Sequence, residues 1–164
     1  MVRLRGVDVR EAVPSEHAAL GELCVAAYSV LGGLSDGYGA RLRDVAGRAA
    51  TARVLVAAEG GRLLGCVTLI LEGGPLRELA GADEGEFRML AVDPAAQGRG
   101  AGAALVRACV GEARRAGRAR IVLSTARDMT AAHRLYERLG FARAPARDWS
   151  PVAGVQLLAY ELEL

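Results

Sequence analysis

The sequence predicts a single α/β domain built on one mixed sheet, and two observations lead to this class. Strand-like patterns dominate the first half, and two of them are joined by a hairpin turn. The second half alternates strand, helix, strand, helix and strand, which is the order of an α/β domain. With 164 residues, 52% of them hydrophobic, the chain fits one compact domain over 1–164 and can bury a core.

The first half is expected to hold a strand, two helical segments and then three strands. Alternating apolar and charged residues indicate a strand over Val7–Ala12. Pro14 and Glu16 frame a helix start with Ser15 as the N-cap, and a shorter amphipathic helix is expected over Tyr38–Ala49. The remaining strands are expected at Val54–Ala58 and Leu63–Leu71, joined by the turn Glu59-Gly60-Gly61-Arg62, and at Glu86–Val92.

The second half is expected to contain two helices that each end at a glycine. Apolar residues at helical spacing predict a helix over Gly100–Ala116 that ends at Gly117. A second helix over Thr130–Leu139 is closed by Gly140. The strands of this half are expected at Arg120–Ser124, Phe141–Ala144 and Val155–Leu162.

Composition and charge exclude several classes of protein. The net charge is +2 and the basic residues are scattered, whereas a nucleic-acid interface needs a clustered basic face. The apolar run Leu63–Leu71 is too short to span a bilayer, and the N-terminus lacks the apolar region of a secretory signal. We therefore expect a cytoplasmic protein with no nucleic-acid or membrane partner. The absence of Lys and Asn, whose codons are AT-rich, indicates a GC-rich bacterial genome.

Three cysteines, Cys24, Cys66 and Cys109, lie far apart in the sequence and form no CxxC motif. None of them lies in a predicted loop beside a histidine, so a catalytic cysteine is not expected. We interpret all three as reduced residues that fill small apolar spaces.

The most informative segment runs from Glu86 to Gly102. A strand leads through Asp93-Pro94 into a glycine-rich turn that opens directly into a helix. The first N–H groups of a helix lack internal partners and lie at the positive end of its dipole. Glycines let this backbone approach a phosphate closely. The segment therefore predicts a phosphate-bearing ligand at residues 97 to 102.

Two common phosphate-binding motifs fit this segment poorly. A Walker A loop requires a lysine, and the chain has none. The Rossmann fingerprint is matched by Gly98, Gly100 and Ala103, but it also requires an acidic residue at the end of the next strand. That strand ends in Ser124-Thr125, and the turn follows the fourth strand instead of the first.

Three motifs in register resemble the GNAT superfamily of N-acetyltransferases. Gln97-Gly98-Arg99-Gly100-Ala101-Gly102 matches that family's [Q/R]xxGx[G/A] pyrophosphate loop, and Arg88–Pro94 is similar to its fourth strand. Ala132–Phe141 resembles the helix and turn that close its active site. The resemblance implies a mixed, mostly antiparallel sheet of about seven strands flanked by about four helices.

The resemblance also implies acetyl-CoA as the cosubstrate, no metal, and transfer of the acetyl group to an amine. The pantetheine arm would pair with the backbone of the fourth strand, and the pyrophosphate would lie on the loop. The implied cofactor-binding residues are Leu90, Ala91, Val92, Gln97, Gly98, Arg99, Gly100, Ala101 and Gly102.

Two catalytic residues are implied by the family's motifs. Tyr136, in the LYExLGF motif, would protonate the departing thiolate of CoA. Glu86 is either the base that deprotonates the amine or a solvated carboxylate at the end of a strand. One departure is Met129, which stands where the family often has an Asn that contacts the CoA arm. His133 is interpreted as a surface or boundary residue.

The acceptor is expected to be a small cationic amine. The loop before the fourth strand carries a set of carboxylates that would attract a cation, namely Glu72, Glu78, Asp83, Glu84 and Glu86, against the single Arg77. Further candidates for the acceptor pocket are Tyr28, Asp36, Tyr38 and Trp149, the last of which is equally interpretable as a packing residue. Alternatives are a peptide or protein N-terminus as acceptor, or a non-catalytic acetyl-CoA sensor. Analogy with the family also allows a homodimer.

Overall fold

The computed structural model describes residues 2–4 and 6–164, which form one mixed sheet covered by helices on both faces. The strand order is β1-β2-β3-β4-β5-β6-β8-β7. Neighbouring strands are antiparallel except β5 and β6, which are parallel. The strands are β1 (Val2–Leu4), β2 (Val7–Glu11), β3 (Arg53–Glu59), β4 (Arg62–Ile70), β5 (Glu84–Val92), β6 (Arg120–Ala126), β7 (Ala142–Arg143) and β8 (Leu157–Glu163).

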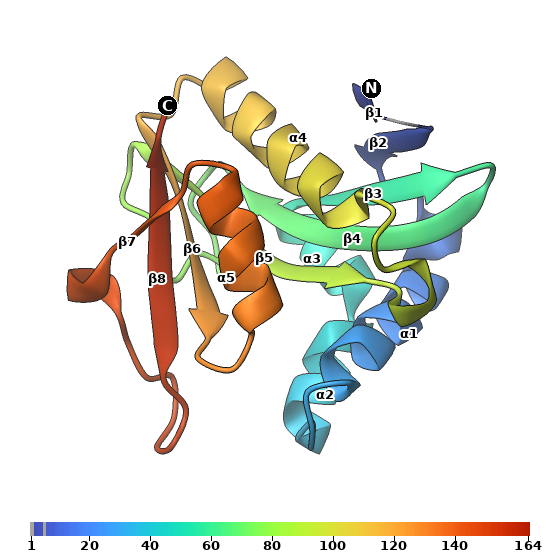
Figure 1. Cartoon of the computed structure of the whole chain (residues 1–164), viewed down its shortest axis with the longest axis horizontal. Coiled ribbons are helices and arrows are strands. Elements are labelled where there is room, and N and C mark those ends of the chain that lie inside the picture. The colour runs from blue at the N-terminus through green and yellow to red at the C-terminus, as the bar shows by residue number, and fades with distance from the viewer. Residues whose placement is uncertain (1, 5) are drawn as a thin grey trace.

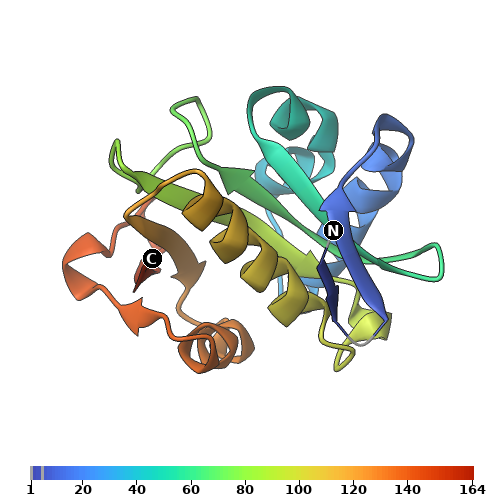
Figure 2. The same cartoon turned by 90° about the horizontal axis from the view of Figure 1, so that it is seen from above.

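Two groups of helices cover the two faces of the sheet. Figure 2 shows α4 and α5 on one side of the sheet, and α1, α2 and α3 on the other. The helices are α1 (His17–Ser29), α2 (Asp36–Arg43), α3 (Val45–Thr51), α4 (Ala101–Arg115) and α5 (Thr130–Arg138). Short 3-10 turns precede α1 at Pro14–Glu16, precede α4 at Pro94–Ala96, and follow β7 at Pro145–Arg147.

The predicted fold class is confirmed, and the one additional strand is only 3 residues long. β1 is the strand that the sequence analysis did not expect. The predicted hairpin joins β3 to β4, with positive φ angles of 55° at Gly60 and 82° at Gly61. Both glycines thus supply backbone conformations that an L side chain disfavours.

Two details of the first half differ from expectation. The predicted N-cap Ser15 lies instead within the 3-10 turn, and α1 begins at His17. The turn forms because the Glu16 carboxylate accepts hydrogen bonds from the Val13 N–H and from Arg10. The single helix predicted over Tyr38–Ala49 is two helices, because the side chain of Asp44 caps a new helix at the Gly47 N–H.

Each face of the sheet buries its own apolar core. The larger core lies between the sheet and α4 and α5 and includes Leu69, Phe87, Leu105 and Leu123. The smaller core lies between the sheet and α1–α3 and includes Leu20, Cys24, Leu42, Val56 and Cys66. All three cysteines are free and buried. No helix in the described part of the chain is long and apolar enough to cross a membrane.

Candidate active site

The two parallel strands β5 and β6 diverge in the middle of the sheet. They pair only where Glu84, Gly85 and Glu86 face Arg120, Ile121 and Val122. Beyond that point β5 continues to Val92 and β6 to Ala126, and Figure 1 shows the two strands separating. The facing backbone groups therefore lack a strand partner and can accept an extended ligand in the manner of an added strand. We call this feature the β5–β6 opening.

A bulge in β5 shapes one side of this opening. The register between β4 and β5 shifts between Cys66 and Thr68, and Met89 on β5 has a φ of 54°. Among the described residues it is the one non-glycine with a positive φ, a strained conformation of the kind that clusters at functional sites. After the bulge, the side chains of Leu90 and Val92 pack against the larger core, while Ala91 belongs to the smaller one.

The glycine-rich turn at the end of β5 leaves the start of α4 open. Asp93 stabilises the turn, because its carboxylate accepts a hydrogen bond from the Ala95 N–H at 3.0 Å and pairs with Arg62 at 3.1 Å. Gly98 and Gly100 have φ angles of 81° and 83°, and space is open around the Cβ position of each. Gly100 caps α4 without a side-chain hydrogen bond. This geometry fits a pyrophosphate group.

The flanking side chains of the turn point to the surface. Gln97 and Arg99 are exposed, and Arg99 forms an ion pair of 2.6 Å with Glu59 in the β3–β4 hairpin turn. Gly102 lies inside, since a Cβ added there would meet Leu135 of α5 at 3.2 Å. The backbone of the turn is thus accessible at Gly98 and Gly100, and binding of a phosphate at residues 97 to 102 stays a prediction.

Tyr136 lies in an aromatic cluster beneath the β5–β6 opening. Its ring centroid is 5.8 Å from that of Phe87, 6.0 Å from that of Phe141 and 5.9 Å from that of Tyr160. The residue is 4% exposed. Burial raises the pKa of Tyr136 well above its ordinary value, with a further contribution from neighbouring Cys109 and Tyr160. The phenol is therefore protonated at neutral pH, which is the state a proton donor requires.

Glu86 is fully buried at the start of the divergence. Its Oε2 accepts three hydrogen bonds from backbone N–H groups of the preceding loop, those of Glu78, Leu79 and Ala80, at 3.0, 3.1 and 3.3 Å. Its Oε1 is buried and has no hydrogen-bond partner. The interpretation as a solvated strand-end carboxylate is therefore wrong. The Oε2 atom binds the loop, and the Oε1 atom makes no hydrogen bond.

Two tyrosines from the opposite helices approach the same region. The rings of Tyr28 on α1 and Tyr38 on α2 meet edge to face with their centroids 5.9 Å apart. Burial raises the pKa of Tyr28 well above its ordinary value, and nearby Tyr38 and Tyr136 raise it further. Burial also raises the pKa of Tyr38, although the charge of Arg88 on β5 opposes this. Tyr28 and Tyr38 thus lie together on the face of the sheet that carries the smaller core.

The predicted acidic rim is largely neutralised. Glu78 pairs with Arg88, Glu72 pairs with Arg118, and Glu84 pairs with both Arg147 and Arg120. Glu86 is bound by backbone N–H groups. The sequence analysis counted only Arg77 against these carboxylates, because the arginines that pair with them come from β5, β6 and distant loops.

The remaining candidate residues have mainly structural contacts. His133 lies within hydrogen-bonding distance of the Ala126 carbonyl, with Nε2 at 3.0 Å, and its ring packs against Tyr160. The backbone of Trp149 pairs with Leu157. Asp36 is exposed at the start of α2, and Met129 precedes α5 without a side-chain cap.

Two features of the opening were missed by sequence reasoning. The bulge at Met89 gives no signal in the sequence, because Met89 begins the apolar run 89–92 at the end of β5. Thr125 on β6 is buried, and its Oγ1 has no hydrogen-bond partner. A threonine that follows the apolar run 121–123 and Ser124 was the only available signal for this group.

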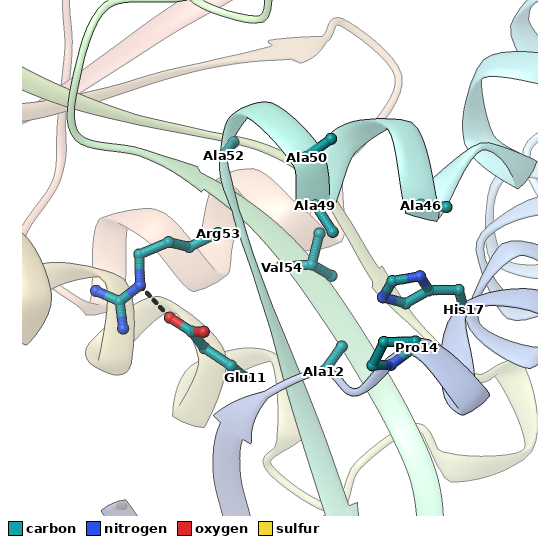
Figure 3. A pocket seen from close by; sticks show the side chains of 10 residues that line it. All are labelled: Glu11, Ala12, Pro14, His17, Ala46, Ala49, Ala50, Ala52, Arg53 and Val54. Carbon is teal, nitrogen blue, oxygen red and sulfur yellow. Dashed lines mark hydrogen bonds and ion pairs between the residues drawn. The ribbon is translucent and has the colours of Figure 1, made fainter.

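A separate surface hollow lies away from the opening. Figure 3 shows it between the start of α1, α3 and the edge of β3. Its volume is about 320 Å³, and five alanines and the ion pair between Arg53 and Glu11, 2.5 Å long, form much of its lining. None of the predicted site residues contributes to it.

Comparison with known proteins agrees with this geometry. The profile of the acetyltransferase (GNAT) family matches residues 29–141. The search among curated proteins found no match. Among solved structures, the yncA protein of Salmonella typhimurium, solved with its cofactor acetyl-CoA, is 27% identical with a TM-score of 0.67, covering 97% of this chain and 94% of that one.

Two further solved structures are similar in fold. PH1933 from Pyrococcus horikoshii is 17% identical with a TM-score of 0.75, covering 96% of this chain and 98% of that one. The ribosomal-protein-S18-alanine N-acetyltransferase of Escherichia coli is 21% identical with a TM-score of 0.68, covering 96% and 93% of the two chains.

Proposed function

Because this chain belongs to the GNAT family of acetyltransferases and is an enzyme of that family, we propose that it transfers the acetyl group of acetyl-CoA to a small amine at the β5–β6 opening. The observation that carries this proposal is the alignment of three features along one path. The open glycine turn lies at one end of β5, the unpaired backbone of β5 follows, and Tyr136 lies below it.

Each part of this path has a role in the proposed reaction. Bound acetyl-CoA supplies an activated thioester. The first N–H groups of α4, together with those of Gly98 and Gly100, would bind the pyrophosphate. The backbone of Leu90, Ala91 and Val92 would hold the pantetheine arm, and an N–H group near the bulge would donate a hydrogen bond to the thioester oxygen.

The proton transfers are assigned to two buried side chains. Tyr136 would donate its phenolic proton to the departing CoA sulfur, because burial keeps it protonated. The free Oε1 of Glu86 would accept the proton of the amine, directly or through a water. The Oε2 of the same carboxylate stays bound to the loop, so the geometry of the base is fixed.

The acceptor is proposed to be a small amine bound beside Tyr28 and Tyr38. The ion pairs that neutralise the rim remove the main electrostatic support for a strongly cationic acceptor. Tyrosine rings can pack against apolar parts of an amine and also accept a cation on their faces. The tyrosines therefore support an amine with an apolar or aromatic portion, whatever its charge.

A peptide N-terminus is a second candidate acceptor, for which exposed apolar residues provide support. Val30 and Leu31 between α1 and α2 are 69% and 49% exposed, and Val152 and Val155 between β7 and β8 are 62% and 41% exposed. The two loops extend toward the same end of the molecule in Figure 1. Apolar residues on both loops would suit a longer substrate.

The proposed function is tested by replacing Tyr136 with Phe. Release of free CoA from acetyl-CoA is measured against a panel of small amines and short peptides. We expect Tyr136→Phe to lower kcat by about 10²-fold or more, because the proton donor is lost while the ring is retained. Acetyl-CoA binding, measured by calorimetry, should remain unchanged.

Tyr160→Phe is the matched control for this experiment. Tyr160 belongs to the same aromatic cluster, but its hydroxyl donates a hydrogen bond to Glu137 at 3.0 Å. Its replacement should leave kcat within about twofold of the wild-type value. Acetyl-CoA binding without acetylation of any amine or peptide would instead favour a sensor, and a protein that binds no acetyl-CoA would refute the proposal.

A further inference from the structure

A pair of cysteines lies in the smaller core beneath α1. The Sγ atoms of Cys24 on α1 and Cys66 on β4 lie 3.4 Å apart and share a hydrogen bond. Both residues are buried, with 0% and 1% exposure, and both are free thiols. A disulfide bond is about 2.05 Å long, so a small movement separates the pair from a covalent link.

Arg48 places a positive charge beside this pair. Arg48 on α3 is 4% exposed, and its Nη2 lies 3.8 Å from the Sγ of Cys24. Its other donors bind neutral acceptors, namely the Thr68 hydroxyl at 3.0 Å and the carbonyls of Arg41 and Leu42 at 2.6 and 3.1 Å. Within the described ranges 2–4 and 6–164, no carboxylate pairs with it. A thiolate is therefore the group in contact that can balance this buried charge.

The two thiols differ in proton affinity. The hydrogen bond from Cys66 lowers the pKa of Cys24. Burial opposes this shift, and the charge and hydrogen bond of Arg48 add to it, so the pKa lies below its ordinary value. The same hydrogen bond and burial raise the pKa of Cys66 well above its ordinary value. Of the two thiols, Cys24 thus loses its proton more readily and is the better nucleophile, while the adjacent Cys66 keeps its proton, an arrangement typical of redox-active cysteines.

We propose that Cys24 and Cys66 form a reversible disulfide when the protein meets hydrogen peroxide. The Cys24 thiolate attacks one peroxide oxygen, the O–O bond breaks, and Cys24 becomes a sulfenic acid as hydroxide leaves. The Cys66 sulfur then attacks the Cys24 sulfur, and the S–O bond breaks as the S–S bond forms. The oxygen of the sulfenic acid leaves as water with the thiol proton of Cys66. The hydroxide released earlier takes up one further proton and becomes the second water. Two thiols and one peroxide thus give one disulfide and two waters. A dithiol reductant reverses the oxidation.

Peroxide must reach a buried pair, and two properties make this feasible. Hydrogen peroxide is only slightly larger than water. It can enter when the helical layer opens locally, since such openings need less free energy than global unfolding. Bulkier thiol reagents should therefore react much more slowly than peroxide.

The position of the pair links it to the candidate active site. Cys66 is paired with Ala91 of β5, and the register shift that makes the bulge begins at Cys66. Cys24 lies one helical turn before Tyr28 on α1. A disulfide would pull α1 toward the bulge and change the sulfur that lies beside Arg48. We expect oxidation to lower acetyl transfer, and this consequence alone rests on the proposed function.

The test treats the full chain with hydrogen peroxide and follows its intact mass and free thiols. We expect the loss of two hydrogen atoms, one remaining thiol, and a Cys24–Cys66 cross-link in the non-reducing peptide map. Cys109 is the internal control, because it is equally buried but lies in the other core, where burial raises its pKa above the ordinary value. Dithiothreitol should restore all three thiols.

Variants separate this chemistry from general oxidation. Cys24→Ser and Cys66→Ser should abolish the cross-link, whereas Cys109→Ser should retain it. Arg48→Met should slow disulfide formation by about tenfold, because the thiolate loses its counter-charge. Circular dichroism shows whether Arg48→Met folds. If it does not, the oxidation rates of Cys24, Cys66 and Cys109 in the wild-type chain still show whether peroxide selects the Cys24–Cys66 pair.

Three results would overturn the inference. Cys24 and Cys66 could stay free at peroxide concentrations that oxidise Cys109, or form only disulfides between molecules. Either result would exclude the internal pair. A disulfide that forms without any change in acetyl transfer would overturn the regulatory consequence. If the protein shows no acetyltransferase activity, the proposed function fails. The mass measurement would still test whether Cys24 and Cys66 form a disulfide.

Discussion

At the scale of single residues, buried polar groups around the β5–β6 opening each have a distinct environment. Tyr136 is surrounded by aromatic rings, and burial is the main reason that it stays protonated, with a further contribution from Cys109 and Tyr160. Glu86 has three backbone donors on one oxygen and none on the other. Arg48 is satisfied by carbonyls, a hydroxyl and a thiol. Buried polar atoms without partners are uncommon in folded proteins, so the Oε1 of Glu86 is a candidate for contact with a ligand.

Glu86→Gln should separate the two roles of this carboxylate. The amide oxygen of Gln can still accept hydrogen bonds from the N–H groups of residues 78–80, so the loop should keep its position. The basic oxygen is lost, and we expect kcat/KM for the amine to fall by about 10²-fold with acetyl-CoA affinity unchanged. Steady-state kinetics at several pH values provide the measurement, and the defect should shrink at high pH, where more of the amine is already neutral.

Glu72→Gln is the control for this change, because Glu72 lies in the same rim and its side chain is 81% exposed. Its replacement should leave the kinetics unaltered. A Glu86→Gln enzyme with wild-type kcat/KM would show that Glu86 anchors the loop and takes no part in proton transfer.

At the scale of elements, the packing of β4 against β5 sets the shape of the opening. Gly65 on β4 faces Val92, and a Cβ added at Gly65 would lie 2.5 Å from the carbonyl oxygen of Ala91. The glycine is therefore required by the close approach of the two backbones near the bulge. The bulge itself releases β5 from regular pairing, which lets it diverge from β6.

Gly65→Ala should displace β5 at Ala91. We expect a loss of about 1–3 kcal/mol in the free energy of unfolding, because the strand must shift to relieve the contact. Acetyl-CoA affinity should fall as well, since the proposed contacts use the backbone of Leu90–Val92. Denaturant unfolding and calorimetric binding provide the two measurements.

Gly37→Ala is the matched control, because Gly37 lies in α2 with open space around its Cβ position. This change should be neutral or stabilising by up to about 1 kcal/mol. If Gly65→Ala binds acetyl-CoA as tightly as Gly37→Ala does, the backbone of β5 does not hold the cofactor.

At the scale of the whole molecule, ion pairs join segments that are distant in sequence. Glu84 at the start of β5 pairs with Arg147 at 2.6 Å and with Arg120 at 3.1 Å, and Arg147 also pairs with Glu161 at 3.2 Å. Burial acts to raise the pKa of Glu84, but hydrogen bonds from Arg147, the Gly81 N–H and Arg120 outweigh it and lower the pKa. This network connects β5, β6 and β8 at the closed end of the opening.

The network should make the fold sensitive to acid. A carboxylate whose pKa is lowered by folding contributes stability above its unfolded pKa, about 4.3 for Glu, and this contribution is lost as the pH falls through the folded pKa. We expect Tm to fall steeply below about pH 4.5. Glu84→Gln should lower the free energy of unfolding by about 1–3 kcal/mol at pH 7. Its Tm should also fall less steeply with acid than the Tm of the wild type.

Thermal unfolding between pH 3 and pH 7 tests this expectation, with Glu72→Gln again as the exposed control. If Tm falls equally steeply with acid in the wild type and in Glu84→Gln, other carboxylates cause the acid sensitivity. Asp148 is the next candidate, because the hydrogen bonds from Arg143 lower its pKa.

The fold class, most strand and helix positions, and the family could be predicted from the order of the residues. Periodicity identifies elements well because burial on one face of a helix or strand dictates local spacing. The shape of the glycine turn at residues 97 to 102 was equally predictable, since it depends on contiguous residues and on a backbone that only glycine adopts easily.

Only the tertiary structure decided the features that depend on residues far apart in the chain. The Met89 bulge arises from the register between β4 and β5, and the rim charges are cancelled by arginines from other elements. The contact between Cys24 and Cys66 spans 42 positions of sequence. Such pairings follow from how packed layers meet in space, and no local pattern encodes them, because charge, burial and proximity are properties of the assembled core.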